Sequence, residues 1–174
     1  LGDVYKRQLF TADSSLEGEM TSADISGLIG QYAHGNEPSH HIIHMYNYVD
    51  QPYKTQELVD SVLHTLYFND PNGLSGNEDC GQMSAWYILN AMGFYQVCPG
   101  NPVYSIGRPL FNKATVNLKD GKKFTVIAKN NSRENKYIQS MVLNGKALDK
   151  PFFTHQDIVN GGTLELTMGD QIKK

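Results

Sequence analysis

Two acidic segments of the sequence have the residue types for chemistry, and the first surrounds Glu37. In residues 35–41, Glu37 directly precedes Pro38. Proline suits the first position of a helix, because its missing N–H would be unpaired there anyway. We therefore expect Glu37 at the N-cap of a helix over 38–49, where the helix dipole favours an ionised carboxylate. Such a group can face a cavity, or it can serve only as a helix cap, although Glu is a poor capping residue.

The second acidic segment places Glu78 and Asp79 after a glycine-rich loop. Gln82 follows Asp79 by three residues, a spacing that predicts a capping box at the start of a helix over 80–92. An ionised carboxylate before a helix can also act as a general base if a water lies within its reach. Because a carboxylate has two oxygens, Asp79 can do both.

Histidines near Glu37 have a spacing that could bind zinc. His40 and His44 are four residues apart, with His41 beside them. However, zinc sites normally use three or four protein ligands, and a His-Glu-x-x-His motif is absent from the sequence. We therefore expect ordinary hydrogen-bonded histidines.

The elements that must position these groups change character near Gly100. Before it, apolar spacing and proline positions predict helices over 23–33, 38–49, about 52–66 and 80–92, the last ending at Gly93. After it, Asp120-Gly121 and Asn144-Gly145 predict tight hairpins, and Gly161-Gly162 precedes an alternating strand over 163–168. Helices followed by strands indicate an α+β arrangement or two units.

Composition excludes some classes of function. The 174 residues are 40% hydrophobic with a formal net charge of −3, which gives no reason to expect nucleic-acid binding. No apolar run approaches the roughly 20 residues of a membrane span. Cys80 and Cys98 could form a disulfide or remain buried thiols, and we favour thiols. Residues 1–8 have the sequence that a sequencing-library adapter would encode, so we exclude them from fold reasoning.

Chemistry alone leaves two uses open for the acidic segments. Paired carboxylates at the mouth of a helical array are compatible with glycoside hydrolysis. They are equally compatible with a calcium site, because this hard cation prefers oxygen ligands.

The residue strings are more specific than their spacing. Ala23 to His41, including Gly35-Asn-Glu-Pro-Ser-His-His41, and residues 46–56, 73–87 and 93–107 resemble the signature sequences of glycoside hydrolase family 92. The resemblance extends over essentially everything after about Leu9. It implies a calcium-dependent exo-α-mannosidase that inverts configuration, with an N-terminal β-sandwich and an (α/α)6 barrel. Residues 9–99 would form the last barrel helices, and residues 100–174 an antiparallel β segment.

The resemblance also implies roles for single residues. Asp79 matches the general base, and Asn77, standing where family members often have a second acid, would only orient water. Glu37, with Asn36, would lie near calcium and the mannose. The remaining candidates for the surroundings of the sugar are Glu78, Glu19 and His34.

Other implications concern what lies beyond this chain. The family's general acid has no match here, so we expect the chain to need the rest of its enzyme for activity. A mannose-containing glycan is the implied partner, in the periplasm or outside the cell. The alternatives are a non-catalytic carbohydrate-binding or scaffold segment and an (α/α)6 phosphorylase or lyase. The phosphorylase is disfavoured because the sequence has no Gly-rich phosphate loop or Arg cluster.

Overall fold

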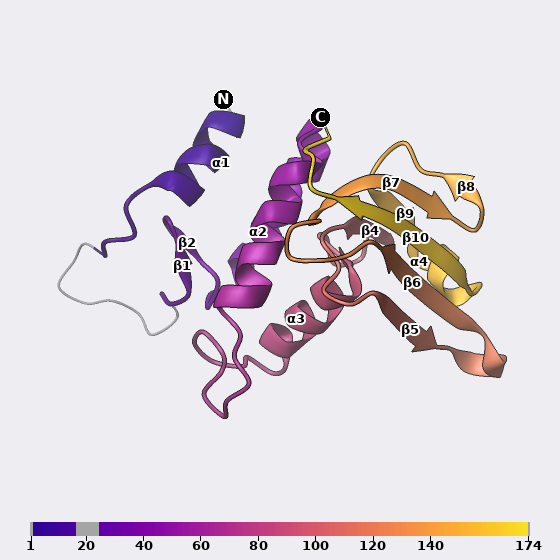
Figure 1. Cartoon of the computed structure of the whole chain (residues 1–174). Helices are drawn as coiled ribbons and strands as arrows, with labels where there is room; N and C mark the ends of the chain where they lie inside the picture. The colour runs from indigo at the N-terminus through magenta and orange to yellow at the C-terminus, as the bar shows by residue number, and fades with distance from the viewer. Residues whose placement is uncertain (1, 17–24, 174) are drawn as a thin grey trace.

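The computed structural model describes residues 2–16 and 25–173 and separates into a helical half and a β half (Figure 1). The α-helices are α1 (Gly2–Thr11), α2 (Pro52–Thr65), α3 (Gln82–Met92) and α4 (His155–Val159), and the 3-10 helices are η1 (Glu37–Ser39), η2 (Ile42–Val49) and η3 (Lys119–Gly121). The strands are β1 (Leu28–Ile29), β2 (Tyr32–Ala33), β3 (Phe94–Tyr95), β4 (Val103–Ile106), β5 (Lys113–Asn117), β6 (Lys123–Lys129), β7 (Tyr137–Leu143), β8 (Lys146–Ala147), β9 (Phe152–Thr154) and β10 (Gly162–Gly169). Within the described residues, no helix has both the length and the apolar character to cross a bilayer.

The helical half is organised around α2 and α3. Proline opens α2, and Val59, Val62 and Leu63 form its buried stripe, as the sequence predicts. Fully burying such a side chain stabilises the fold by roughly 1.5–3 kcal/mol. Gly93, with φ of 102°, ends α3 as expected. The core of this half comprises Tyr32, Ile43, Val59, Val62, Leu63, Trp86, Ala91 and Tyr95.

Two predicted helices of this half are wrong. Within 23–33, residues 28–33 form the antiparallel hairpin β1–β2, whose turn includes Gly30 at φ of 61°; residues 23 and 24 lie outside the described part. The helix predicted over 38–49 is instead η1 and η2, separated at residues 40–41. Ser39 Oγ donates to the carbonyls of Ala33 and Asn36, both at 2.7 Å, and such side-chain bonds compete with a regular helix.

The β half confirms the α+β class and the predicted turns. Asp120 and Gly121 have φ of 59° and 71°, and Asn144 and Gly145 have φ of 49° and 80°, as a type I′ turn requires. The main sheet has the order β5-β6-β10-β7-β8. The hydrophobic core of the β half comprises Phe94, Ile106, Phe124, Val126, Ala128, Ile138, Phe153, Ile158, Leu164, Leu166 and Met168.

A fully antiparallel β segment is, however, wrong in one place. Strand β10 is antiparallel to β7 but parallel to β6, with Leu164 opposite Val126. A parallel pair needs a crossover connection, and here the chain passes through β9 and the short helix α4 before entering the sheet between β6 and β7. This order of strands depends on contacts distant in sequence, which turn signals do not encode.

Polar contacts join the two halves. The backbone N–H of Ile138 in β7 donates to Gln56 Oε1 in α2 at 3.0 Å. Arg108, only 2% exposed, pairs with Asp60 of α2 at 2.9 Å between Nε and Oδ1. The helical half is therefore held against the β half by specific buried partners as well as by apolar packing.

The cysteines differ from both expectations. Cys80 and Cys98 are free thiols, and both are exposed. Each lies in an irregular segment at the surface, so neither the buried thiols nor a disulfide describes this chain.

Candidate functional site

Asp79 lies in an unusual stretch of backbone directly before α3. Asp79, Cys80 and Gly81 have φ of 51°, 55° and 91°, all in the left-handed region. This conformation suits glycine but costs a non-glycine residue of the order of 1–3 kcal/mol, and such strain is concentrated at functional sites. Asp79 is half-buried here.

The predicted capping box is wrong. Helix α3 begins at Gln82, and its N-cap is Gly81, which has no side chain to cap with. Glu78 serves the helix end instead: its Oε1 accepts from the Ser84 N–H at 2.9 Å and its Oε2 from Ser84 Oγ at 2.7 Å. These bonds to the charged form lower the pKa of the Glu78 carboxyl.

Glu37 is also shifted from its predicted place. It lies in the first turn of η1, and Asn36 is the N-cap, with no side-chain capping hydrogen bond. Asn36 is exposed and Glu37 is half-buried. Neighbouring amide and carboxylate oxygens are therefore presented at this turn.

A hydrogen-bonded bridge connects the Glu37 segment to the Asp79 segment. His40 Nε2 lies 2.9 Å from the backbone oxygen of His34, and His40 Nδ1 lies 3.1 Å from Gln82 Nε2. Because a carbonyl only accepts, Nε2 carries the proton and Nδ1 accepts from Gln82. The Trp86 indole N–H also donates to the His40 carbonyl at 3.2 Å. The two acidic segments are thus tied together through η1 and α3.

The loops that carry the acids also approach each other closely. A Cβ added to Gly76, which has φ of 88°, would lie 2.9 Å from Ser26 Oγ and 3.4 Å from Gly35 Cα. The loop before Asp79 therefore packs against the backbone just before Glu37. Glycine at position 76 serves both the turn and this close approach.

The histidines are hydrogen-bonded core residues, as the sequence predicts. His34 lies between the hydroxyls of Tyr32 and Tyr67, at 2.9 and 2.7 Å, and His44 lies 2.9 Å from Asn90 Oδ1. Burial lowers the pKa of His34 to about 3 and that of His44 to about 4. Both rings are therefore neutral near pH 7, and they hold structure together by hydrogen bonds.

The oxygens of Asn36 and Glu37 fit part of a calcium shell. Calcium takes six to eight oxygen ligands, and an amide next to a carboxylate is a suitable pair. Among the described residues, however, no group of three or more His, Cys, Asp or Glu side chains is placed to hold a metal ion. A calcium ion at this turn would need most of its oxygens from outside these residues.

Of the remaining predicted site residues, Asn77 is exposed in the loop before Asp79. Glu19 lies outside the described residues. Gln82 was expected only as a helix cap, yet its Nε2 contacts His40 and donates to the Tyr95 hydroxyl at 3.1 Å. Its partner His40 is 42 residues away in sequence. Only the tertiary structure brings these side chains together.

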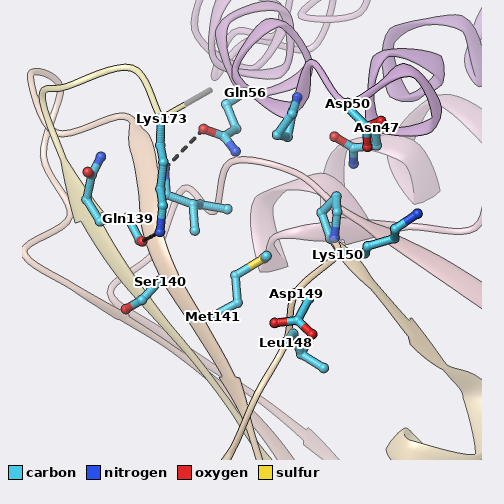
Figure 2. Close-up of a pocket in the computed structure, with 13 residues that line it drawn as sticks. Asn47, Asp50, Gln56, Gln139, Ser140, Met141, Leu148, Asp149, Lys150 and Lys173 are labelled. Carbon is cyan, nitrogen blue, oxygen red and sulfur yellow. Dashed lines mark hydrogen bonds between the residues drawn. The ribbon is translucent and has the colours of Figure 1, made fainter.

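A separate cavity of about 450 Å³ lies between the helical half and the β half (Figure 2). Its walls come from η2, α2, β7, the segment after β8 and the C-terminal tail. None of the predicted site residues within the described ranges lines it. The lining residues are Asn47, Asp50, Pro52, Gln56, Ile138, Gln139, Ser140, Met141, Leu148, Asp149, Lys150, Pro151 and Lys173.

Solved structures of family GH92 mannosidases are similar to this chain. The chain is 40% identical, with a TM-score of 0.88, to the family GH92 α-mannosidase BT3965 from Bacteroides thetaiotaomicron, covering 98% of this chain and 22% of that one. The same mannosidase in complex with mannoimidazole gives 41% identity and a TM-score of 0.91, with the same coverage. The family GH92 inverting mannosidase BT2199 of that bacterium gives 40% identity and 0.81, over 97% of this chain and 24% of that one.

A sequence relative and a family match complete the comparison. An uncharacterized secreted glycosidase of Arthroderma benhamiae is 34% identical over 140 residues, which are 79% of this chain and 18% of the relative. The chain thus spans about a fifth of the length of the proteins it matches. Residues 6–170 match the glycosyl hydrolase family 92 catalytic domain. The chain therefore belongs to glycosyl hydrolase family 92.

Proposed function

We propose that this chain is part of an enzyme that releases terminal α-linked mannose from glycans by calcium-assisted, inverting hydrolysis. The observation that carries the proposal is the strained Asp79 at the start of α3, tied through Gln82 and His40 to the turn that holds Glu37. Family GH92 relatives described as an α-mannosidase and as an inverting mannosidase support the reaction type.

In this proposal Asp79 is the general base. Its ionised carboxylate takes a proton from a water molecule while the water oxygen bonds to the anomeric carbon of mannose. The glycosidic C–O bond breaks on the opposite face, and a carboxylic acid outside this chain protonates the leaving oxygen. Inversion requires a water between the two carboxyl groups, which places them roughly 6.5–9.5 Å apart.

Glu37 would bind the sugar, and Glu37 and Asn36 would supply two calcium ligands. Calcium, when bound, supplies positive charge beside the sugar hydroxyls and favours a distorted ring. Asn77 orients the attacking water. Glu78 has lone pairs left after its bonds from Ser84, and these can accept from a sugar hydroxyl. Glu19 approaches the same sugar in this proposal.

The bridge between His40 and Gln82 fixes the relative position of the two acidic segments. A general base must be held within a fraction of an ångström of its productive position, and buried hydrogen bonds to its supporting elements provide that. His40 is a positioning residue here, because its ring contacts Gln82 and the His34 carbonyl.

The rest of the enzyme completes the site. Because the chain spans only 22–24% of the GH92 structures, we propose that its helices are the last ones of an (α/α)6 barrel and that the general acid lies in the remainder. A periplasmic or secreted location is supported by the relative described as a secreted glycosidase.

The experiment is a hybrid enzyme in which residues 9–174 of this chain replace the matching segment of mannosidase BT3965. The hybrid should release mannose from mannobiose, and a chelator should abolish the release. The 174-residue chain alone should release none, because it lacks the acid. A hybrid that unfolds cooperatively yet hydrolyses no mannobiose contradicts the proposal, and mannose binding without hydrolysis would favour the carbohydrate-binding alternative.

A further inference from the structure

The cavity between η2, α2 and β7 contains a buried polar atom whose hydrogen bonding is incomplete. Asn47 is only 3% exposed, and its Nδ2 lies 2.7 Å from Ser105 Oγ and 2.8 Å from the Ile106 carbonyl oxygen. Because that carbonyl can only accept, the orientation of the amide is fixed. Asn47 Oδ1 is then a buried acceptor with no partner among the described residues.

An unpaired acceptor of this kind costs roughly 1–3 kcal/mol unless a donor reaches it. Asn47 lines the cavity, so a donor can come from a molecule inside it. A volume of about 450 Å³ falls within the range of roughly 300–1,000 Å³ that is usual for small-molecule sites.

Several other polar groups around the cavity are also acceptors. The Gln139 side-chain amide already donates to the backbone oxygens of Tyr137 and Gln171, which leaves its Oε1 as the free group. Asp50 and Asp149 add carboxylates. Gln56, Lys150 and Lys173 supply donors instead: Gln56 Oε1 accepts from β7, so its amide can donate to a ligand, and the lysine ammonium groups only donate.

The charges around the cavity balance. Two carboxylates, of Asp50 and Asp149, and two ammonium groups, of Lys150 and Lys173, lie around the cavity, so neither a strongly anionic nor a strongly cationic ligand is favoured (Figure 2). Apolar surface is supplied by Pro52, Ile138, Met141, Leu148 and Pro151. Many acceptors, little net charge and apolar walls complement a neutral molecule that has several hydroxyl donors and C–H faces.

We propose that this cavity is a second carbohydrate-binding site, which takes a neutral hexose unit with one hydroxyl donating to Asn47 Oδ1. The site lies on other residues than Asp79 and Glu37, so it does not depend on the proposed catalysis. In a glycan-degrading enzyme it would hold a part of the glycan that is not being cut.

The test is a titration of the 174-residue chain with methyl α-mannoside, followed by NMR of ¹³C-labelled methionine and leucine methyl groups. Met141 and Leu148 line the cavity, whereas Met83 is fully buried elsewhere. The Met141 and Leu148 methyl signals should shift saturably, and the Met83 signal should not. The shifts should persist in Asp79→Asn, which separates this site from the catalytic one.

Two neighbouring substitutions provide the matched control. In Figure 2 Met141 extends into the cavity from β7, whereas Lys146, in the paired strand β8, is exposed and is not among the lining residues. Met141→Trp should fill the cavity and weaken the Leu148 response at least about tenfold, the effect of losing about 1.4 kcal/mol of binding. Lys146→Trp should change it less than about twofold, which is below 0.5 kcal/mol.

Absence of shifts with mannoside and with glucose would overturn the proposal and leave Asn47 Oδ1 to an ordered water. An equal loss of the Leu148 response in both tryptophan variants would also overturn the proposal. A response to spermidine or sulfate but not to sugars would show that the cavity prefers charged ligands, against the assignment to a neutral one.

Discussion

The helical half and the β half of the chain are built on different principles. The core of the β half is apolar, and two of its strand pairs, β5–β6 and β7–β8, are joined by turns that two adjacent residues specify. The helical half buries His34, His40, His44, Asn47 and Asn90 in hydrogen-bonded positions. It also contains the 3-10 helices η1 and η2 and, at Asp79 and Cys80, two consecutive non-glycine residues in the left-handed region. The half that carries the proposed chemistry therefore contains more buried polar groups and more strained backbone, which both oppose folding in free energy.

This difference indicates which half of the molecule holds its side chains in fixed positions. Buried polar networks restrict side chains to one arrangement, because each unmade hydrogen bond is expensive. The bridge from His40 to Gln82 is such a restriction, and it fixes the acidic segments relative to each other. The β half supports this arrangement through Ser105, whose hydroxyl lies 3.1 Å from His44 Nδ1.

The largest expected effect is acid destabilisation of the helical half. Burial lowers the pKa of His34 to about 3 and of His44 to about 4, below the ordinary value of 6.5, so the unfolded chain binds more protons between those limits. Stability is complete above about pH 6.5 and falls as the pH drops toward 4 and 3, with a loss of about 3 kcal/mol per histidine at pH 4.5. Urea unfolding at pH 7 and pH 4.5 measures the loss.

Hydrogen exchange at the two pH values locates this loss, after correction for intrinsic exchange rates. Amides of α2 and α3 should lose protection before those of β6 and β10. His155→Gln, at an exposed position in the β half, should leave the pH dependence unchanged. Equal loss of protection in both halves would contradict the prediction that the helical half is more sensitive to acid.

The next effect concerns the base itself. Asp79→Asn keeps the shape of the side chain but removes the proton acceptor, so kcat of the hybrid enzyme should fall by about 10²–10⁴-fold. Thermal unfolding should change little, because Asn also tolerates the left-handed backbone at this position. Asn72→Ala, at an exposed position in the loop before Asp79, is the comparison variant and should leave kcat unchanged. A kcat within a factor of two of the parent would remove Asp79 as the base.

A smaller effect is expected at the proposed calcium turn. Glu37→Gln should weaken calcium binding by about 10- to 100-fold, measured by calorimetry on the hybrid enzyme, because a charged ligand becomes neutral. Asp50→Asn, outside this turn and also in the helical half, should leave the affinity unchanged. An unaltered calcium affinity in Glu37→Gln would show that other residues bind the ion.

The smallest effect belongs to the β half. Gly145→Ala forces alanine to φ of 80°, although no atom lies within 4 Å of the added Cβ. The cost should be the backbone strain alone, about 1 kcal/mol, seen as a lower unfolding midpoint. Lys146→Ala, next in the chain, should be nearly neutral. A change in kcat of the hybrid would show that the β half does more than support the site.

The same contrast explains what could be predicted from the sequence. Asp120-Gly121 and Asn144-Gly145 specify their turns locally, so both hairpins were predicted correctly. In the helical half, Ile25, Leu28 and Ile29 have helical spacing, yet Leu28 and Ile29 form a strand paired with residues 32–33. The pairing partner and the glycine turn outweigh the apolar spacing there.

The site was predicted as residue types but not as geometry. The acidic segments and the ordinary role of the histidines could be read from the chain, because family signatures and ligand counts are local properties. The left-handed backbone at Asp79 and the exchange of the capping role to Glu78 could not. They depend on the contacts of α3 with Tyr95 and His40 and on the close approach of Gly76 to Gly35, which are tertiary contacts.

The most direct test of the account is the configuration of the sugar first released. Proton NMR of mannobiose hydrolysis by the hybrid enzyme should show β-mannose before mutarotation, because water activated by Asp79 attacks opposite the leaving group. Asp79→Asn should show neither anomer on the same time scale. Initial release of α-mannose would instead require a covalent sugar intermediate, and it would contradict a base-activated water at Asp79.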